Sequence, residues 1–249
     1  MGMFIDVHCH LEMLKDLDKI IKEDVKKDVG IIVWNGVNRE VNRQILEFCF
    51  EHKEVRAALG IYPIDALKLS DEEIDEEIEF IKENKKRIVA IGEVGLDYKE
   101  DLKQKERQKE IFRKFIKLAI ELNKPIIVHS RKAEEDAVKI LEKMKAKKVI
   151  VHCFMGNFSL VDRISNNGWT FTIPGIIKNS EHFQEIVKRT NIGQILCETD
   201  SPFLHPDKKF PNFPENVIEN YEIIAKIRNI GIKEVEKQLE ENYKKLFGN

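Results

Sequence analysis

A (β/α)₈ TIM barrel is the fold that this sequence predicts, on the basis of three observations. Short β-type runs recur eight times, each followed by a longer charged segment in which apolar residues have helical spacing. The length of 249 residues is typical of one such barrel. No Pro-, Gly- or Ser-rich linker divides the chain, so we expect residues 1–249 to form a single domain. A doubly wound sheet is the main alternative.

The expected strands are short runs rich in Ile and Val. They are Phe4–His8, Gly30–Asn35, Val55–Gly60, Ile88–Gly92, Pro125–His129, Val149–His152, Trp169–Ile173 and Gln194–Glu198. Pro125 can begin its strand, because the first residue does not need a backbone N–H for the ladder.

The expected helices are segments in which Ile, Leu, Phe and Val recur every three or four residues. They include Arg39–Glu51, Asp71–Asn84, Gln104–Asn123, Lys132–Lys145 and Glu181–Thr190. Ser70 precedes three acidic residues and is a suitable N-cap. The tail from Pro214 to Phe247 predicts one or two helices, broken near Gly231, that close the outer ring.

Composition excludes several classes of protein. Apolar residues make up 42% of the chain, enough for a sizeable core, and the net charge of −2 gives no overall field that attracts nucleic acid. A polyanion would therefore need a local patch or metal ions. No apolar run is long enough to span a membrane and the N-terminus lacks a signal-peptide pattern, so we expect a cytoplasmic protein. Cys9, Cys49, Cys153 and Cys197 show no CxxC spacing and are expected to be buried, reduced thiols.

Titratable residues collect at the carboxyl ends of five expected strands. His8 and His10 would share one face of the first strand, with Cys9 pointing the other way. Glu93 follows the fourth strand, His129 and His152 end the fifth and sixth, and Asp200 follows the eighth. In a parallel barrel these ends converge on one mouth, where barrel enzymes place their active sites.

Each of these residues alone has a structural explanation. A histidine at the end of a strand is often a hydrogen-bonded core residue, and Glu93 or Asp200 could cap the next helix. Together, four imidazoles and two carboxylates are too many for one tetrahedral ion with an open position, but they suit two ions that share a carboxylate. The carboxylates favour Mg²⁺ or Mn²⁺ and the imidazoles favour Zn²⁺ or a similar ion.

The motifs around these residues resemble those of a known family. The stretches are Ile5–Leu11, Gly92–Tyr98, Val128–Arg131, Val151–Phe154 and Glu198–Pro202, with Asn242–Phe247 near the end of the chain. In order and spacing they resemble the TatD family of metal-dependent deoxyribonucleases, within the amidohydrolase-like barrels. The resemblance implies that His8, His10 and Asp200 hold one divalent ion, that His129 and His152 hold the other, and that Glu93 bridges them.

The same resemblance implies a substrate and a proton acceptor, and positions along the chain suggest roles for further residues. The substrate would be DNA or another phosphodiester, and Asp200 would accept the proton of the attacking water. Arg131 could pair with a phosphate or be an ordinary surface residue, and Lys208 and Lys209 could guide a nucleic-acid backbone. Glu198, on the same face as Asp200, could orient the ligands by hydrogen bonding. Asp6, on the same face as His8, could do likewise or could join a buried polar network. By strand parity, Cys9, Cys153 and Cys197 are expected to pack against the outer helices.

Two stretches depart from the family pattern and leave the substrate open. Tyr62 stands where many members have a histidine, and Lys208–Pro214 replaces the usual arginine-glycine and asparagine-glutamate-proline stretch. Hydrolysis of carboxylic esters, lactones or amides on the same metal pair is the alternative activity, because one fold can serve many reactions. A non-enzymatic binding module is a remote alternative. The sequence leaves the physiological metal, the cleavage polarity and the oligomeric state open.

Overall fold

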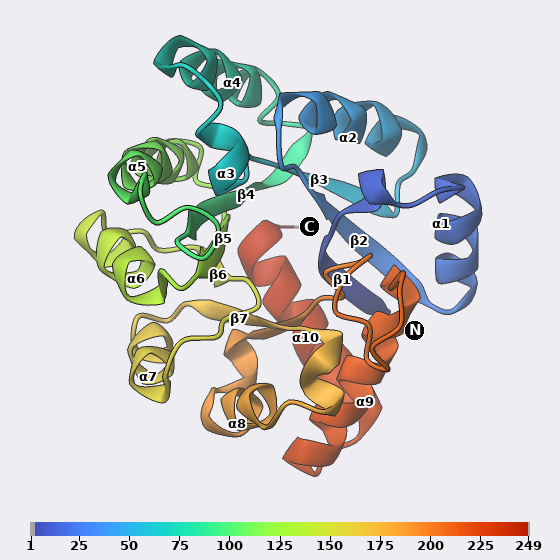
Figure 1. The fold of residues 1–249 in the computed structure, drawn as a ribbon. Helices are drawn as coiled ribbons and strands as arrows, with labels where there is room; N and C mark the ends of the chain where they lie inside the picture. Colours follow the sequence, from blue (N-terminus) through green and yellow to red (C-terminus); the bar gives the residue numbers. More distant parts are fainter. Residues whose placement is uncertain (1–2, 249) are drawn as a thin grey trace.

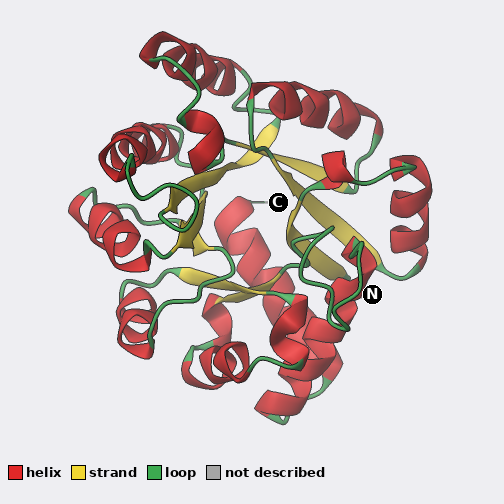
Figure 2. Cartoon of the chain, viewed as in Figure 1, coloured by secondary structure: helices red, strands yellow, loops and turns green. Residues whose placement is uncertain are grey.

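Eight parallel strands form the barrel that the sequence predicts (Figures 1 and 2). The computed structural model describes residues 3–248. The strands follow one another around the sheet in chain order, each hydrogen-bonded to the next. Their bounds are β1 Phe4–Cys9, β2 Val29–Asn35, β3 Val55–Leu59, β4 Ile88–Asp97, β5 Ile126–Arg131, β6 Val149–Val151, β7 Thr170–Ile173 and β8 Ile195–Cys197.

Helices alternate with the strands and surround them (Figure 1). Their bounds are α1 Leu17–Lys26, α2 Arg39–Glu51, α3 Pro63–Ala66, α4 Asp71–Glu83, α5 Lys105–Glu121, α6 Glu134–Lys143, α7 Phe158–Asn166, α8 Glu181–Arg189, α9 Val217–Arg228 and α10 Ile232–Phe247. Short 3₁₀ turns occupy η1 Leu11–Met13, η2 Gly175–Lys178, η3 Ile192–Gln194 and η4 Pro214–Asn216. Ser70 caps the start of α4, as the sequence predicts, and its reciprocal hydrogen bonds with Glu73 complete a capping box.

Several strand ends differ from the expected ones, and the differences affect the site. β4 continues to Asp97, so Glu93 lies within the strand rather than after it, while β6 stops one residue before His152. β5 begins at Ile126, one residue after Pro125. The long β4 pairs with β5 as far as Asp97 and Arg131. Gly95 makes this close pairing possible, because a Cβ atom there would lie only 2.0 Å from the carbonyl oxygen of His129 and its φ is +151°.

The C-terminal tail divides as predicted, but its second helix does not join the outer ring. The chain breaks between α9 and α10 at Asn229 to Gly231. In Figure 1, α10 runs across the barrel instead of along its side. Its Tyr243, Leu246 and Phe247 pack with Ile5 and other side chains of the barrel interior. Burying these apolar groups over the end of the barrel removes them from water, which explains the placement.

Two backbone hydrogen bonds join the first strand to the segment that follows the last one. The amide of Asp200 donates to the carbonyl oxygen of His8 at 2.9 Å, and the amide of His10 donates to that of Ser201 at 2.7 Å. The ring is thus joined at the residues that the sequence marks as candidate ligands. Any change in this seam would move His8, His10 and Asp200 together.

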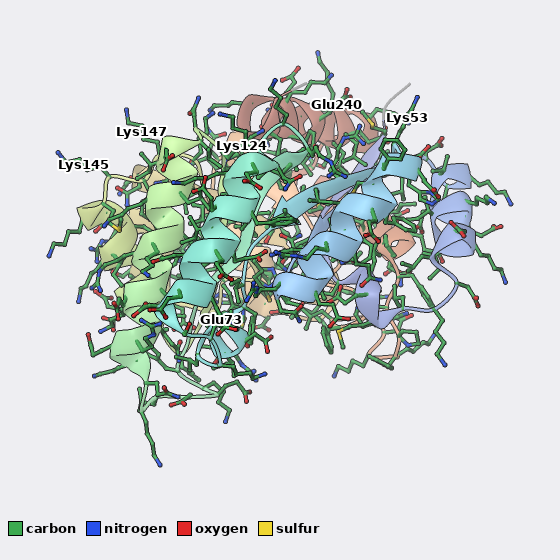
Figure 3. All side chains as sticks on the ribbon, turned by 90° about the horizontal axis from the view of Figure 1, so that it is seen from above. Lys53, Glu73, Lys124, Lys145, Lys147 and Glu240 are labelled. Atoms are coloured by element: carbon green, nitrogen blue, oxygen red, sulfur yellow. The ribbon has the colours of Figure 1, made fainter. Side chains whose placement is uncertain are left out.

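Charged side chains cover the outer helices (Figure 3). Ion pairs cross between neighbouring helices, for example from Arg39 to Glu76 at 3.0 Å and from Lys114 to Asp75 at 2.7 Å. Exposed pairs of this kind each contribute little to stability. Among residues 3–248, no helix combines the length and the apolar character needed to cross a bilayer.

A buried carboxyl group on α1 predicts a pH-dependent stability. Burial, with a smaller effect from the charge of Glu215, raises the pKa of Asp24 to about 7, and its Oδ2 has no hydrogen-bond partner among residues 3–248. The folded state therefore holds a proton that the unfolded state releases above about pH 4. Stability is lost as the pH rises towards 7, because ionisation then has to occur in a buried site.

We therefore compare the unfolding free energy of Asp24→Asn with that of the wild type at two pH values. We expect the variant minus wild-type difference to be about 1–3 kcal/mol larger at pH 8 than at pH 5. Guanidinium unfolding at both pH values measures this difference. Asp28→Asn, an exposed position two residues after α1, is the control. An Asp24→Asn difference that is the same at pH 5 and pH 8 would contradict the prediction.

Candidate metal centre

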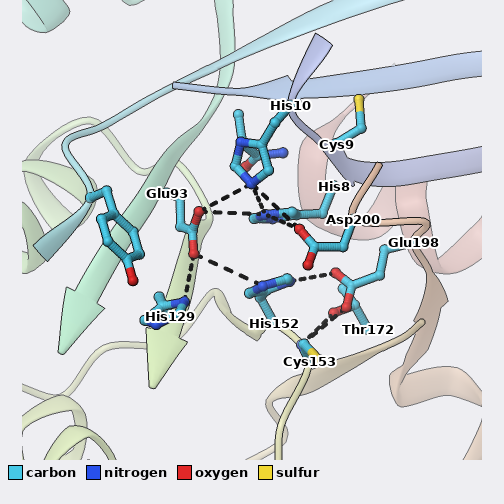
Figure 4. Close-up of polar contacts among 12 residues, drawn as sticks. His8, Cys9, His10, Glu93, His129, His152, Cys153, Thr172, Glu198 and Asp200 are labelled. Atoms are coloured by element: carbon cyan, nitrogen blue, oxygen red, sulfur yellow. Dashed lines mark hydrogen bonds and ion pairs between the residues drawn. The ribbon is translucent and has the colours of Figure 1, made fainter. Parts of the chain in front are cut away.

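The structure brings together all six side chains that the sequence marks as candidate ligands (Figure 4). β1 carries His8, and His10 follows its last residue. Glu93 projects from β4 and His129 from β5, whereas His152 and Asp200 come from the segments after β6 and β8. The six side chains lie at the carboxyl end of the barrel because successive parallel strands all end on that side.

His8, His10 and Asp200 form one group of donor atoms. The Nε2 atoms of His8 and His10 are 3.2 Å apart. Asp200 Oδ1 lies 3.7 Å from His8 Nε2 and 3.4 Å from His10 Nε2. Cys9 points away and donates to the carbonyl oxygen of Val33, as the strand alternation predicts.

His129, His152 and Glu93 form a second group. Glu93 Oε1 lies 2.7 Å from His129 Nδ1 and 3.9 Å from His152 Nε2. The other carboxylate oxygen, Oε2, faces the first group, at 3.6 Å from His8 Nε2 and 3.4 Å from His10 Nε2. The two oxygens of Glu93 are therefore directed at two different sets of donors.

The donor set fits divalent cations. Atoms that share an ion at about 2.0–2.2 Å lie roughly 3.0–3.6 Å from one another, and most of the separations above fall in or near this range. The Nε2 atoms of His8 and His10 face each other and the carboxylates of Glu93 and Asp200. One imidazole nitrogen cannot form hydrogen bonds with all of these neighbours at once, so the two nitrogens need a common partner. Imidazole nitrogen and carboxylate oxygen are ligands for Zn²⁺, Mn²⁺ and similar ions.

Two further carboxylates hold the histidines of the second group. Glu198 Oε2 accepts a hydrogen bond from His152 Nδ1 at 2.7 Å, and its Oε1 accepts one from the amide of Cys153. Asp97 Oδ2 lies 3.1 Å from His129 Nε2 and accepts a hydrogen bond from the Tyr62 hydroxyl at 2.6 Å. Each histidine is thereby oriented so that its other ring nitrogen faces Glu93.

Asp6 belongs to a buried network behind the centre rather than to the donor set. Its carboxylate accepts hydrogen bonds from the amide and the hydroxyl of Thr199, at 2.9 and 2.5 Å. It also accepts one from the amide of His8 at 3.2 Å. The network ties β1 to the chain just before Asp200, so it supports the seam between the first and last strands.

The electrostatics of the cluster favour a cation. Burial opposes ionisation of Glu93, but hydrogen bonds and charge from His129 and His8 outweigh it and hold its pKa well below the usual value. Burial likewise opposes protonation of His10 and His152, yet Asp200 and Glu93 raise the pKa of His10 to about 9, and Glu198 raises that of His152 to about 10. Carboxylates thus dominate the local field, and a bound cation would displace protons from these imidazoles.

A cavity of about 610 Å³ opens onto the cluster. Arg131 lines it and is paired with Glu100 at 3.2 Å. Lys208 and Lys209 are exposed and do not line the cavity. Tyr62 lines the wall beside His129, with ring centroids 5.0 Å apart.

One expectation about the cysteines is wrong in part. Cys9 and Cys197 are buried in the core between the strands and the outer helices. Cys153 packs against the same core but is only half-buried, because it also lines the cavity beside His152. Strand parity fails there because β6 has already ended at Val151 and the backbone of Cys153 has a φ of +40°. Cys49 is also only half-buried.

The role of Asp97 was not recognised from the sequence. The residue lies within the Gly92–Tyr98 motif, but its contact with His129 depends on the pairing of β4 with β5. The apolar side chains of the cavity, among them Met13, Met155 and Phe203, were also missed. Met13 ends the short η1 turn, and Met155 and Phe203 lie on loops, so no periodic pattern signals a shared surface.

Comparison with known proteins identifies the family. The family model for TatD related DNase matches residues 5–248. The chain belongs to the TatD family. This TatD-family chain is 36% identical to an uncharacterized metal-dependent hydrolase of Methanocaldococcus jannaschii, over 98% of this chain and 96% of that protein. It is 33% identical to human deoxyribonuclease TATDN3, over 98% of this chain and 94% of that protein.

A solved structure shows the same fold. The crystal structure of YJJV, a TatD homologue from Escherichia coli, superposes with a TM-score of 0.92 at 26% identity, covering 99% of this chain and 98% of the other. The chain is therefore a TatD-type metal-dependent hydrolase with a TIM-barrel fold.

Proposed function

We propose that this hydrolase cleaves phosphodiester bonds of DNA at a centre that holds two divalent cations, and that residues 1–249 act as one domain. The observation that carries the two-cation proposal is the position of Glu93, whose two carboxylate oxygens face two separate groups of donors. The deoxyribonuclease name of the human relative supports DNA as the substrate.

His8, His10 and Asp200 would hold one cation, His129 and His152 the other, and Glu93 both. When bound, such cations make a water molecule more acidic and offset the negative charge of phosphoryl oxygens. The candidate ligands are four imidazole nitrogens, which favour Zn²⁺ and similar ions, and two carboxylates, which favour Mg²⁺ or Mn²⁺. All three ions are therefore candidates.

The residues of the chain supply orientation and proton transfer. Asp200 lines the cavity, and its backbone is held by His8, so its carboxylate is placed to accept the proton of an attacking water. Glu198 and Asp97 keep His152 and His129 in fixed ring orientations. Their hydrogen bonds limit the movement of the donors while the substrate binds.

Arg131 is the candidate phosphate contact within the cavity. Its guanidinium would exchange Glu100 for a phosphate oxygen pair, a bidentate geometry that arginine favours. Lys208 and Lys209 lie outside the cavity wall, where they could contact the backbone of a longer strand.

The test is metal add-back with a DNA substrate. Metal-stripped protein is incubated with end-labelled single-stranded DNA, and Mg²⁺, Mn²⁺ or Zn²⁺ is added in turn. We expect metal-dependent shortening of the DNA, and the position of the label shows which end is attacked. Mass spectrometry under native conditions counts the bound ions.

Failure to cleave DNA with any ion, although two ions are bound, would overturn the DNA assignment. Carboxylic esters, lactones and amides would then be assayed on the same protein. Binding of a single ion at saturation would overturn the two-cation proposal independently of the substrate.

A further inference from the structure

The mouth of the candidate metal centre carries exposed apolar side chains from three segments that each follow a strand. Met13 follows β1, Met155 follows β6, and Phe203 and Phe210 follow β8. Met13, Met155 and Phe203 line the same cavity as His10, Glu93 and Asp200. Exposed large apolar residues are costly in water, and a group of them beside a site usually indicates a binding surface.

Phe203 lines the cavity, and Phe210, which is not part of the lining, lies beside the Phe203 ring. Their ring centroids are 6.5 Å apart and the rings are inclined by 45°. Phe203 is 42% exposed and Phe210 is 71% exposed, so both rings leave area open to a ligand. Flat, exposed aromatic faces bind planar heteroaromatic groups by stacking.

The charges around the cavity do not favour additional phosphate groups. Its wall includes the carboxylates of Glu12, Asp65 and Glu134, and its arginine, Arg131, is paired with Glu100. Lys178, the last residue of η2, is paired with Asp207 at 2.6 Å and Glu219 at 3.1 Å. With Arg131 assigned to the reacting phosphate and Lys208 and Lys209 outside the cavity wall, an adjacent nucleotide inside the cavity would be held mainly by uncharged side chains.

We propose that Phe203 and Phe210 form a stacking platform for an unpaired nucleobase adjacent to the phosphodiester that is cleaved. This inference rests on the proposed function and specifies its substrate. In a duplex the base faces are covered by neighbouring base pairs, whereas an unpaired or frayed end can place a base against the platform. The platform thus selects strand ends that carry an accessible base.

Binding of an uncleavable strand tests the platform. The probe is a fluorescein-labelled single-stranded hexanucleotide with phosphorothioate linkages, compared with the same strand carrying abasic residues at both ends. Fluorescence anisotropy gives Kd for the metal-loaded protein. We expect the wild type to bind the strand with terminal bases about 5- to 50-fold more tightly, since stacking of one base contributes on this scale.

The variants separate stacking from general apolar contact. Phe203→Ala with Phe210→Ala is expected to weaken binding of the base-bearing strand by the same factor and to leave the abasic strand unchanged. Phe203→Tyr with Phe210→Tyr keeps the aromatic faces and is expected to retain the preference. Phe50→Ala, which removes a ring that is 84% exposed on α2, is the matched control.

Equal affinity of the wild type for the two strands would overturn the proposal. So would a double alanine variant that weakens both strands equally, or one that keeps the wild-type preference. The cleavage assay is independent of this result. A preference for terminal bases without cleavage of the unmodified strand would support Phe203 and Phe210 as a nucleobase-binding surface. It would overturn DNA cleavage as the function, and with it the placement of that surface beside a cleaved bond.

Discussion

Replacing Glu93 with glutamine is expected to lower the rate of DNA hydrolysis by roughly 1,000-fold or more and to reduce the amount of bound metal. Glu93 is buried, and its two oxygens lie 2.7 Å from His129 Nδ1 and 3.4 Å from His10 Nε2. Glutamine has a similar shape but lacks the charge and presents an NH₂ group to one set of donors. The two groups would then lose their common anionic ligand.

Initial rates with end-labelled DNA, together with metal content by elemental analysis, measure both effects. Glu47→Gln, the same change at an exposed position of α2, controls for the substitution itself. Circular dichroism would show whether the Glu93 variant is folded. A folded Glu93→Gln protein with wild-type rate and two bound ions would exclude the proposed bridging role.

Replacing Asp200 with asparagine is expected to reduce kcat by about 10²- to 10⁴-fold, the range associated with loss of a general base. The amide retains an oxygen that can face His8 and His10, but it cannot accept a proton. The hydrogen bond from the Asp200 amide to the His8 carbonyl oxygen is a backbone contact and survives the change. Metal content should therefore decrease much less than kcat.

The test compares how much kcat falls with how much bound metal is lost. Single-turnover rates give the chemical step and native mass spectrometry gives the occupancy of each variant. Asp162→Asn, at an exposed position of α7, is the control. If Asp200→Asn loses metal in proportion to activity, Asp200 acts as a ligand alone and another group accepts the proton.

The barrel could be predicted because its elements are local. Alternation of strand and helix is encoded in short windows, such as the apolar run of β2 or the capping box at Ser70, and neither depends on distant contacts. Element ends were less predictable. β4 extends past Gly92 because its last residues pair with β5, which is an interaction between separate segments.

The difference between local patterns and contacts between separate segments also explains which features the sequence did not predict. α10 has the amphipathic pattern of an outer helix, but its apolar face covers the end of the barrel. Asp97 and Tyr62 were seen as parts of motifs, yet their contact with each other joins residues 35 positions apart. Cys153 follows the end of a strand, where parity no longer predicts direction.

The sequence by itself determined the eight-fold strand and helix order, the TatD resemblance and the six candidate ligands, because each depends on residue type and spacing along the chain. Only the tertiary structure decided that Glu93 faces two donor groups, that Glu198 and Asp97 orient the histidines, and that Phe203 and Phe210 share the rim. These contacts arise when strands pair and loops meet at the barrel mouth, so their distances are set by packing rather than by separation in the sequence.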